Sequence, residues 1–434
     1  MTVTVDQQRL VLNAFAAIFQ NNLVSKDLVT WRKFDNEMND RNGLTVVEQV
    51  TPDYTTTFTA GTGGSNGSGV ADLTGGVQDT IFGSEQYKLN QTIGSSMGWG
   101  DFVKIRDIGE ARESQALRKA ALRLATDIDA YILSFAARAS NNWLGDGVSA
   151  VAEWDDVASG YTRLKEQGVD DDGNLRAVLT YGDKQALGAD VLSDNASLTD
   201  VGEGVYRNGW EGKVAGIPTL FTQQLPSFTT GSRNQTAALT AGTADSATTY
   251  AQVAISPGVG QYKTQILNMG SLGNATTIAD GEIFTIAGVY AYDNRAKKIL
   301  DHLQEFRVVG SPTVSAGGAA AVRVFPALIL TGPHRTIGAA PANTAAVTFK
   351  GAASTVLQPR FLANKDAIIV HTADLITPAT GKSMRKSLTK IPVSVRMWQD
   401  SVFATGEHRV RFDVALEANV AADARERLVR INGS

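Results

Sequence analysis

The chain of 434 residues contains no cysteine. This absence excludes disulfide bonds, thiol nucleophiles and thiolate metal ligands, and it predicts a protein that works in a reducing compartment. Charged residues are also scarce, at 19% of the chain against a usual ~25%. The net charge of −4 at pH 7 leaves no basic excess that would draw the chain to nucleic acid or anionic lipid by charge alone.

A long hydrophobic run is also missing. The run Leu10–Phe19 is apolar apart from Asn13. It is shorter than the ~20 residues that span a bilayer, and no cationic leader precedes it. Its apolar positions instead predict an amphipathic helix over Val5–Asn21 that packs on a protein surface. We therefore expect a soluble chain with no membrane partner.

Histidine is rare, and its copies lie far apart in the sequence: His302, His334, His371 and His408. No two are close enough to form the histidine pair of a zinc-binding helix. No G-x-S-x-G motif marks a nucleophilic serine. We therefore predict that the chain is not an enzyme, and that it has no catalytic, cofactor-binding or metal-binding residues and no cofactor.

Two short motifs are similar to binding loops but lack an essential residue. Residues 381–383, Gly-Lys-Ser, match the end of a phosphate-binding loop, yet Ile376 stands where that motif needs a glycine. The acidic run Asp170–Asp172 lacks the further acids and the closing glutamate of a calcium loop. Neither motif predicts a ligand site.

What the sequence does contain is an unusually long helix, predicted over Asp107–Ser140. Asp107 and Glu110 resemble a capping box, and Arg123 and Asp127 can pair across one turn. A helix of about thirty residues would be a rod of roughly 45 Å. Its apolar stripe recurs every three or four residues and defines the face expected in the core: Leu117, Ala121, Leu124, Ile128, Ile132, Phe135 and Ala139.

Before this helix, the sequence predicts an arm and a hairpin. Residues 1–44 combine the amphipathic helix with a polar connector that contains Trp31 and Phe34. Residues 45–105 predict an extended β-hairpin with a glycine-rich tip at Gly61–Gly69. Its expected strands are Thr45–Val50, Tyr54–Phe58, Val77–Ile81 and Gln86–Ile93. An isolated hairpin is marginal in water, so this one is expected either to pack on another subunit or to be a mobile surface loop.

Shorter elements are predicted after the long helix. They are a helix over Val151–Gln167, a strand over Ala177–Tyr181, a helix over Gly182–Leu192 and a strand that ends near Phe221. The first of these helices is expected to bury one side, made of Trp154, Val157, Tyr161 and Leu164.

Residues 227–341 differ in composition, because serine, threonine, alanine and glycine dominate. Short apolar runs recur there at Gln252–Ile255, Glu282–Ile286, Phe306–Val309 and Val322–Phe325. This spacing predicts a small β-barrel or sandwich inserted into a mixed domain. Strands are expected again within Phe361–His371, Pro392–Trp398 and His408–Leu416, and the charged tail Asp423–Ser434 is expected to be exposed.

This order of elements and three particular segments carry a resemblance to a known family. The segments are Arg106 through Arg118-Lys119-Ala120-Ala121 to Asp129, then Lys213-Val214-Ala215-Gly216 leading to Leu225-Pro226, and finally Asp280–Val289 followed by Leu303–Val308. The chain resembles the major capsid proteins of tailed phages, which have the Hong Kong 97-type fold. In particular, it resembles the podovirus coat-protein branch with an inserted telokin-like (immunoglobulin-like) domain.

The resemblance implies an α+β fold and a division of the chain. The implied parts are an N-terminal arm (1–44), an extended β-hairpin loop (45–105), a peripheral domain with the spine helix (106–175), the first part of an axial domain (176–226), an inserted β domain (227–341) and a return to the axial and peripheral domains (342–434). The implied function is that of a major capsid (coat) protein, which self-assembles into the icosahedral shell enclosing phage double-stranded DNA.

The partners follow from the same resemblance. They are further copies of the chain, as pentamers and hexamers in a capsid lattice, a portal protein, and packaged double-stranded DNA bound without sequence specificity. Residues 1–44 are too short for the fused scaffolding segment of some relatives, so a separate scaffolding protein and no maturation cleavage are expected. The implied location is the virion capsid, assembled in the host bacterial cytoplasm.

Two other functions remain open from the sequence. A phage surface or tail adhesin could use the inserted β domain to bind glycans, although adhesins rarely need a long buried helix and an arm. A hydrolase could assemble a catalytic triad from distant histidines, and alanine replacement of each histidine would test it.

Overall fold

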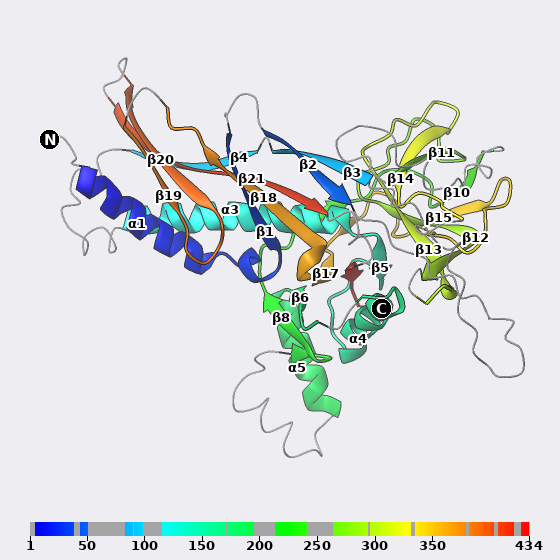
Figure 1. Ribbon diagram of the computed structural model, residues 1–434. Coiled ribbons are helices and arrows are strands. Elements are labelled where there is room, and N and C mark those ends of the chain that lie inside the picture. The colour runs from blue at the N-terminus through cyan, green and yellow to red at the C-terminus, as the bar shows by residue number, and fades with distance from the viewer. Residues whose placement is uncertain are drawn as a thin grey trace, which may run out of the picture.

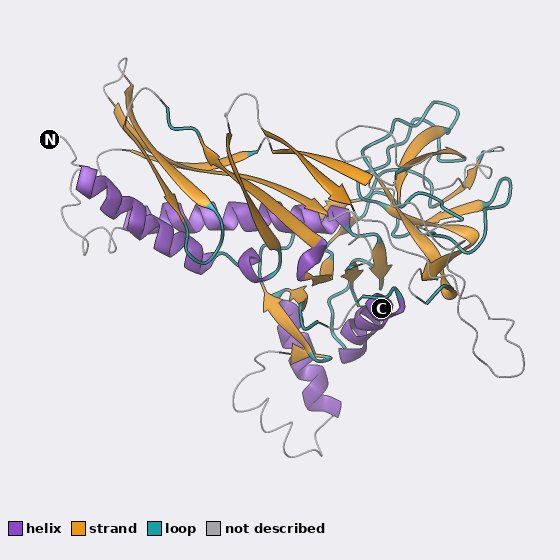
Figure 2. Ribbon diagram, in the orientation of Figure 1, coloured by secondary structure: helices purple, strands orange, loops and turns teal. Residues whose placement is uncertain are grey.

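The computed structural model describes residues 5–38, 44–50, 83–89, 91–98, 115–169, 172–194, 213–240, 264–293, 296–330, 335–378, 382–402, 407–420 and 427–433. These residues form an elongated body, a smaller sheet with two helices, and a β-barrel at one end of the body (Figure 1). Strands make up most of the body and the barrel, while two long helices run along one side of the body (Figure 2).

The body is built on a six-stranded sheet with the order β1-β18-β21-β20-β19, in which β4 also pairs with β21. β1 and β18 are parallel, and the other pairs are antiparallel. The strands are β1 (Thr30–Met38), β4 (Thr92–Gly98), β18 (Ile368–Leu375), β19 (Lys382–Ser387), β20 (Ser394–Val402) and β21 (Glu407–Val420). Alternate residues of β21 belong to the main buried cluster, as the two-residue period of a strand requires: Val410, Phe412, Val414 and Leu416. Asp413 and Ala415, on the opposite face, are buried as well.

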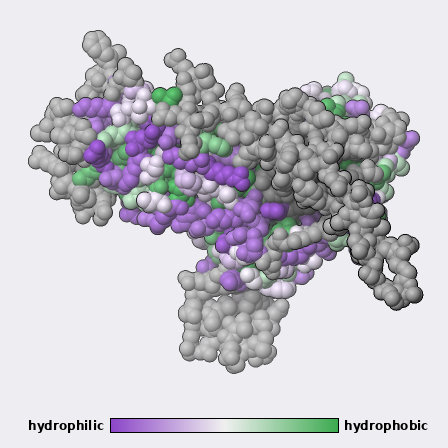
Figure 3. Space-filling model, viewed as in Figure 1, coloured by the Kyte–Doolittle hydropathy of each residue, from purple (hydrophilic) through white to green (hydrophobic). Residues whose placement is uncertain are grey.

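Helices α1 (Val5–Asn22) and α3 (Gln115–Ala139) pack on this sheet and on each other. Phe15 of α1 stacks on Phe412 of β21, with ring centroids 3.9 Å apart. The amphipathic helix predicted near the N-terminus is therefore confirmed, and the surface it packs on belongs to its own subunit. The outer faces of these helices lie in a largely hydrophilic part of the surface (Figure 3).

The long helix is confirmed over Gln115–Ala139, and its predicted start at Asp107 lies outside the described residues. Arg123 and Asp127 form the expected pair, with Nη2 and Oδ1 3.1 Å apart. Phe135 is only partly buried. The rest of the predicted stripe is buried: Leu117, Ala121, Leu124, Ile128, Ile132 and Ala139. No helix among the described residues combines the length and apolar character needed to cross a membrane.

Two predictions near the chain ends are wrong. The supposed polar connector around Trp31 and Phe34 is strand β1, because its backbone pairs with β18. The described part of the C-terminal tail is buried, since β22 (Leu428–Ile431) lies between β5 (Asn142–Leu144) and β17 (Arg360–Asn364). The tail was expected to be exposed because it contains many charged residues. Arg430 is nevertheless buried, and its guanidinium donates hydrogen bonds to backbone carbonyls.

The second sheet has the order β5-β22-β17-β6-β8-β7 and carries helices α4 and α5. Its remaining strands are β6 (Leu175–Leu179), β7 (Lys213–Val214) and β8 (Ile217–Phe221), and the helices are α4 (Trp154–Glu166) and α5 (Tyr181–Asp194). Val157 and Leu164 are buried as predicted, and Tyr161 is partly buried. Trp154, expected on the same buried side, is exposed, because it is the first residue of α4 and lies beyond the packed turns.

The predicted hairpin is present at its base as a two-stranded antiparallel ribbon of β2 (Leu44–Val50) and β3 (Gly83–Leu89). Leu89 packs in a buried cluster with Ala373, Leu375 and Ala415, so the ribbon is anchored to the body sheet. Residues 86–93, expected as one strand, are divided between β3 and β4. Tyr54–Phe58, Gly61–Gly69 and Val77–Ile81 lie outside the described residues.

The inserted β unit is a closed barrel with the strand order β10-β11-β14-β13-β12-β15. Its strands are β10 (Thr236–Leu239), β11 (Gln265–Gly270), β12 (Ile283–Asp293), β13 (Lys298–Val308), β14 (Ala320–Phe325) and β15 (Ala346–Phe349). Strand β15 lies beyond residue 341, the expected end of the insertion. The run Gln252–Ile255 is outside the described residues. A short pair, β9 (Phe228–Thr229) with β16 (Val356–Leu357), joins the two chain segments that connect barrel and body.

Candidate functional site at the junction of body and barrel

No group of three or more histidine, aspartate and glutamate side chains suited to holding a metal occurs in the part of the chain that the structure describes. His371 is buried in β18, His302 lies on β13 and His408 belongs to β21, so these three are not brought together as a triad. His334 lies outside the described residues. Polar side chains are concentrated instead where the end of α3, β5 and β22 meet β12 and β13. We call this region the junction.

Arg430 is the central residue of the junction. Its Nη2 donates to the carbonyl oxygen of Gly281 at 2.7 Å, on the barrel, and more weakly to that of Ser140 at 3.4 Å, just after α3. The guanidinium also lies near the rings of Trp143 and Phe228, 5.6 and 5.5 Å from their centroids. One buried side chain of β22 therefore touches the barrel, the end of the long helix and the connecting segment.

Glu305 of β13 joins the barrel to β5. Its Oε2 accepts a hydrogen bond of 2.7 Å from the backbone N–H of Trp143, and its Oε1 forms a short ion pair with Lys350 Nζ. The same Nζ donates to the carbonyl oxygen of Trp143 at 2.7 Å. Glu305 is buried, so its charge is compensated by these two partners rather than by water. The backbone of β5 at Trp143 is thus held against the barrel by the carboxylate of Glu305 and the ammonium group of Lys350.

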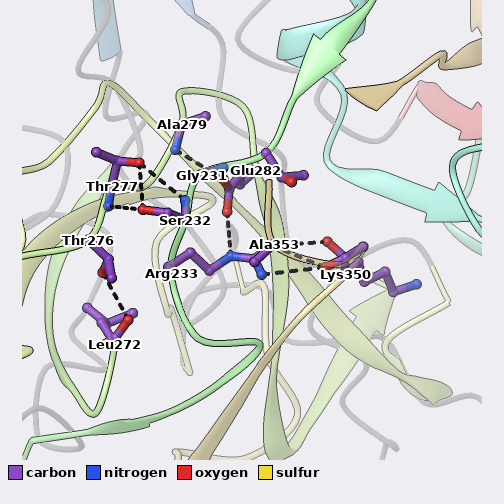
Figure 4. A network of polar contacts seen from close by, with 12 residues as sticks. Gly231, Ser232, Arg233, Leu272, Thr276, Thr277, Ala279, Glu282, Lys350 and Ala353 are labelled. Carbon is purple, nitrogen blue, oxygen red and sulfur yellow. Dashed lines mark hydrogen bonds and ion pairs between the residues drawn. The ribbon is translucent and has the colours of Figure 1, made fainter. Parts of the chain in front are cut away.

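A buried ion pair also joins the segments that precede β10 and β12, at one end of these barrel strands (Figure 4). Arg233 Nε donates to Glu282 Oε2 at 2.7 Å, and both side chains are fully buried. Glu282 Oε1 accepts from the backbone N–H groups of Gly231 and Ala279. Arg233 also stacks over Phe349, 4.3 Å from the ring centroid. These contacts hold the segment that leads into the barrel against β12 and β15.

The barrel and the end of α3 approach each other closely at Gly281. A Cβ atom there would come within 2.9 Å of Arg138 Cα, and the residue has φ +86°, which favours glycine. Arg307 Nη1 donates to the carbonyl oxygen of Arg138 at 3.1 Å, which occupies an acceptor at the helix end. Burial lowers the pKa of Arg307 to about 10, while Asp280 raises it. Burial, and secondarily Arg307, lower the pKa of Arg430 to about 9, so both stay charged at neutral pH.

His302 faces α4 from the barrel side, with Nδ1 3.7 Å from Glu166 Oε2. Burial, together with the nearby cations Arg163 and Lys350, lowers the pKa of His302 to about 4, against a smaller raising effect of Asp301. The ring is therefore neutral in the folded protein at neutral pH.

This depressed pKa predicts an acid-dependent loss of stability. Between about pH 6.5 and pH 4 the unfolded chain binds a proton at His302 and the folded chain does not, so the free energy of unfolding falls as the pH falls. We expect this residue to contribute a loss of about 1–2 kcal/mol, less than the whole shift because the ring is partly exposed. Urea unfolding of wild type and His302→Gln at about pH 7 and about pH 4.5 measures it. An equal acid loss in both proteins would contradict the assignment.

A further buried carboxylate attaches the N-terminal helix to the body. Asp129 of α3 accepts hydrogen bonds of 2.9 Å from the backbone N–H groups of Val24 and Ser25, at the start of η1 (Ser25–Asp27). Burial raises the pKa of Asp129, and the hydrogen bonds from Ser25 and Val24 oppose that rise. Because these donors come from the segment directly after α1, Asp129 fixes where the N-terminal helix ends against α3.

The sequence did not single out Arg430, Trp143 or Arg233. Glu282, Glu305 and Arg307 lie in the third segment that carried the family resemblance, although no role was assigned to them. The sequence did contain one signal of a buried polar contact: Asp129 is a charged residue directly after Ile128, which belongs to the apolar stripe of α3. The described surface and interior thus offer a set of structural ion pairs and caps, with no assembled catalytic group among the described histidines.

The chain matches, over residues 88–423, the family model described as P22 coat protein (gene protein 5). This match spans more than half of the chain, and the fold has the long helix, ribbon and inserted barrel of such a subunit. The structure is therefore that of a phage shell subunit. The chain belongs to the P22 coat protein family.

The chain is similar to several solved structures. They include the capsid of Ralstonia phage GP4 (TM-score 0.42, 8% identity, 95% of this chain and 88% of that chain) and a structure described as Mycobacterium phage Che8 (TM-score 0.40, 11% identity, 91% and 87%). The CUS-3 coat protein I-domain covers 26% of this chain and 94% of its own length, with a TM-score of 0.17 and 20% identity. No curated protein matches. The family assignment rests on the sequence match.

Membership in this family establishes the function class. The protein is a major coat protein of a tailed-phage capsid, a structural component of the virion that forms a lattice with its own copies. The implied α+β fold of the Hong Kong 97 type with an inserted barrel is confirmed. The adhesin and hydrolase hypotheses are not supported, because the family consists of shell proteins rather than receptor-binding proteins or enzymes.

Proposed function

We propose that this coat protein assembles as pentamers and hexamers into an icosahedral shell around double-stranded DNA, with separate scaffolding and portal proteins as partners. The observation that carries the proposal is the β2–β3 ribbon. It pairs with no other strand in the described part of the chain, although its base is anchored at Leu89. A two-stranded ribbon is only marginally stable alone, so contact with an adjacent subunit would stabilise it.

The parts of the subunit have distinct proposed roles. The ribbon within residues 45–105 extends over a neighbouring copy, and α3 is the strut of the peripheral domain (106–175). The sheet with α4 and α5, together with parts of 176–226 and 342–434, meets its symmetry mates at capsomer centres. The barrel stiffens the subunit through the junction. Interfaces of this obligate kind commonly bury more than about 2,000 Å².

The net charge of the chain supports the proposal that the shell binds its packaged DNA only weakly. The chain has a net charge of −4 and a calculated pI near 5.7. Strong lattice-wide binding of DNA phosphates would require many uncompensated cations and would oppose packaging and release. We therefore propose weak contact with DNA that does not depend on its sequence.

Deletion of Gly61–Gly69 tests the proposed function. Expressed with its scaffolding protein, the wild type is expected to form closed shells in electron micrographs. The deletion variant is expected to fold, with an unchanged circular dichroism spectrum, but to assemble poorly because the chain that connects β2 to β3 is shortened.

The matched control replaces Gly61–Gly69 with a glycine–serine linker of the same length and is expected to restore assembly. Normal shells from the deletion variant would remove the ribbon from the assembly mechanism. A wild-type chain that stays monomeric under every condition, with or without scaffold, would contradict the proposed function.

A further inference from the structure

The outer face of the barrel carries a group that we call the barrel patch: Tyr290 and Ile299, which are exposed, and Tyr292 and Arg335, which are partly exposed. Tyr290 and Ile299 are 43% and 46% exposed. Tyr292 and Ile299 are direct cross-strand partners of β12 and β13, and the neighbouring residues Val289 and Ala291 point inward and are buried. The barrel interior is therefore filled without this group, and the four side chains form an outward-facing surface.

The barrel patch is held in a fixed arrangement. The guanidinium of Arg335 lies over the ring of Tyr292, 4.0 Å from its centroid. Its Nε and Nη2 donate to the carbonyl oxygens of Ile337 and Gly338 at 2.8 and 2.7 Å. A Cβ atom at Gly338 would come within 3.0 Å of Ile299, so the backbone packs closely against that side chain. A surface ordered in advance loses little conformational entropy when a partner binds.

A second exposed group lies at the starts of α4 and α5, and we call it the helix patch: Glu153, Trp154, Asp155 and Tyr181. Trp154 is 51% exposed and Tyr181 is 59% exposed. Glu153 and Asp155 on either side of Trp154 are also exposed.

Asp183 brings these two helix starts together. Its Oδ1 accepts from the backbone N–H of Val151 at 3.1 Å, and its Oδ2 accepts from that of Thr180 at 2.8 Å. Arg360 Nε compensates the buried carboxylate from 2.9 Å. The two exposed aromatic residues therefore stand on adjacent, rigidly connected turns.

We propose that the barrel patch of one subunit docks on the helix patch of a neighbouring copy of this chain, a contact that rests on the proposed shell-forming function. The charges are complementary, because the first patch contains the cation Arg335 and the exposed Lys298 is the residue directly before Ile299 in β13, whereas the exposed Glu153 and Asp155 flank Trp154 in the second. Tyrosine, tryptophan and arginine are the residue types that dominate binding energy at protein interfaces.

The same charges oppose contact of either patch with an identical patch, since like charges would then meet. The contact is consequently heterologous, with different surfaces on the two copies. A heterologous contact repeated by rotation closes into a ring, which is the arrangement a pentamer or hexamer needs.

The absence of cysteine makes a sharp test possible. A chain with both Ile299→Cys and Asp155→Cys is assembled and treated with a short bis-maleimide, and the products are separated under denaturing conditions. We expect a ladder of linked chains that extends beyond the dimer to the size of a capsomer. Each single-cysteine variant is expected to give no ladder.

The matched control pairs Asp155→Cys with Ile266→Cys. Ile266 is on β11 and is 50% exposed, but two strands separate β11 from β12 in the barrel order. We expect no ladder from this control. Shells of the Ile299→Cys/Asp155→Cys chain that yield no linked chains, or a control ladder of equal extent, would overturn the docking proposal while leaving the shell function intact. If wild type forms no shells, the shell function fails, and linking of concentrated soluble chains decides the docking proposal by the same gel.

Discussion

The Ile128→Asp variant is expected to yield no soluble, folded protein. Ile128 is fully buried in α3 within the cluster that joins α1, the long helix and the body sheet. A carboxylate placed there without partners costs several kcal/mol, against a total stability of about 5–15 kcal/mol for a typical domain. The soluble fraction after expression and the far-ultraviolet circular dichroism of any soluble product measure the effect.

The neighbouring residue shows why the missing partners decide the result. Asp129 is also buried, yet it is tolerated because Val24 and Ser25 donate backbone hydrogen bonds to both of its oxygens. The side chain of residue 128 faces the apolar cluster instead.

The control Ile128→Val should remain soluble and lose only about 0.5–1.5 kcal/mol. A soluble Ile128→Asp protein with wild-type helicity and a wild-type unfolding midpoint would show that this face of α3 is not buried in the monomer.

The long helix could be predicted because its signal is local. Apolar residues spaced three and four apart fall on one face of any α-helix, so Leu117, Leu124 and Ile132 are buried whatever covers them. The identity of the covering surface is a long-range property. The sequence predicted only that α1 packs on a protein surface, and the stacking of Phe15 on Phe412 shows that this surface belongs to its own subunit.

Elements whose type depends on a distant partner were harder to predict. Strand β1 contains Arg32, Lys33 and Asp35 and was interpreted as a connector, but its pairing with β18 makes it a strand. The tail was interpreted as exposed because it is charged, while β22 in fact lies between β5 and β17. Strand propensity is weak compared with the pairing available in the folded chain.

The junction could not be predicted for the same reason. Arg430 meets Gly281 and Ser140, residues that are 149 and 290 positions away in the sequence. Nothing in the local pattern around Arg430 distinguishes a buried arginine from a solvated one. The composition of residues 227–341 did predict a β unit, but the pairing of β15 with β10 and β12 carries the barrel beyond that limit.

The second large effect is expected from Arg233→Met. Arg233 and Glu282 form a fully buried ion pair between the segments that precede β10 and β12, and removing the cation leaves the buried carboxylate uncompensated. We expect the free energy of unfolding to fall by about 3–5 kcal/mol. Urea unfolding of the unassembled subunit, followed by circular dichroism and by tryptophan fluorescence, measures the loss.

The double variant Arg233→Met/Glu282→Gln separates loss of charge compensation from loss of packing. Glutamine keeps an oxygen that can accept from the backbone N–H groups of Gly231 and Ala279, so the cap that Glu282 forms is retained while its charge is removed. The double variant should therefore lose less stability than Arg233→Met alone, about 1–2 kcal/mol, because no buried charge is left unpaired. The losses of the single variants Arg233→Met and Glu282→Gln are measured in the same way. If these two losses simply add in the double variant, the two side chains do not stabilise each other. The ion pair would then not be what holds the segment that leads into the barrel.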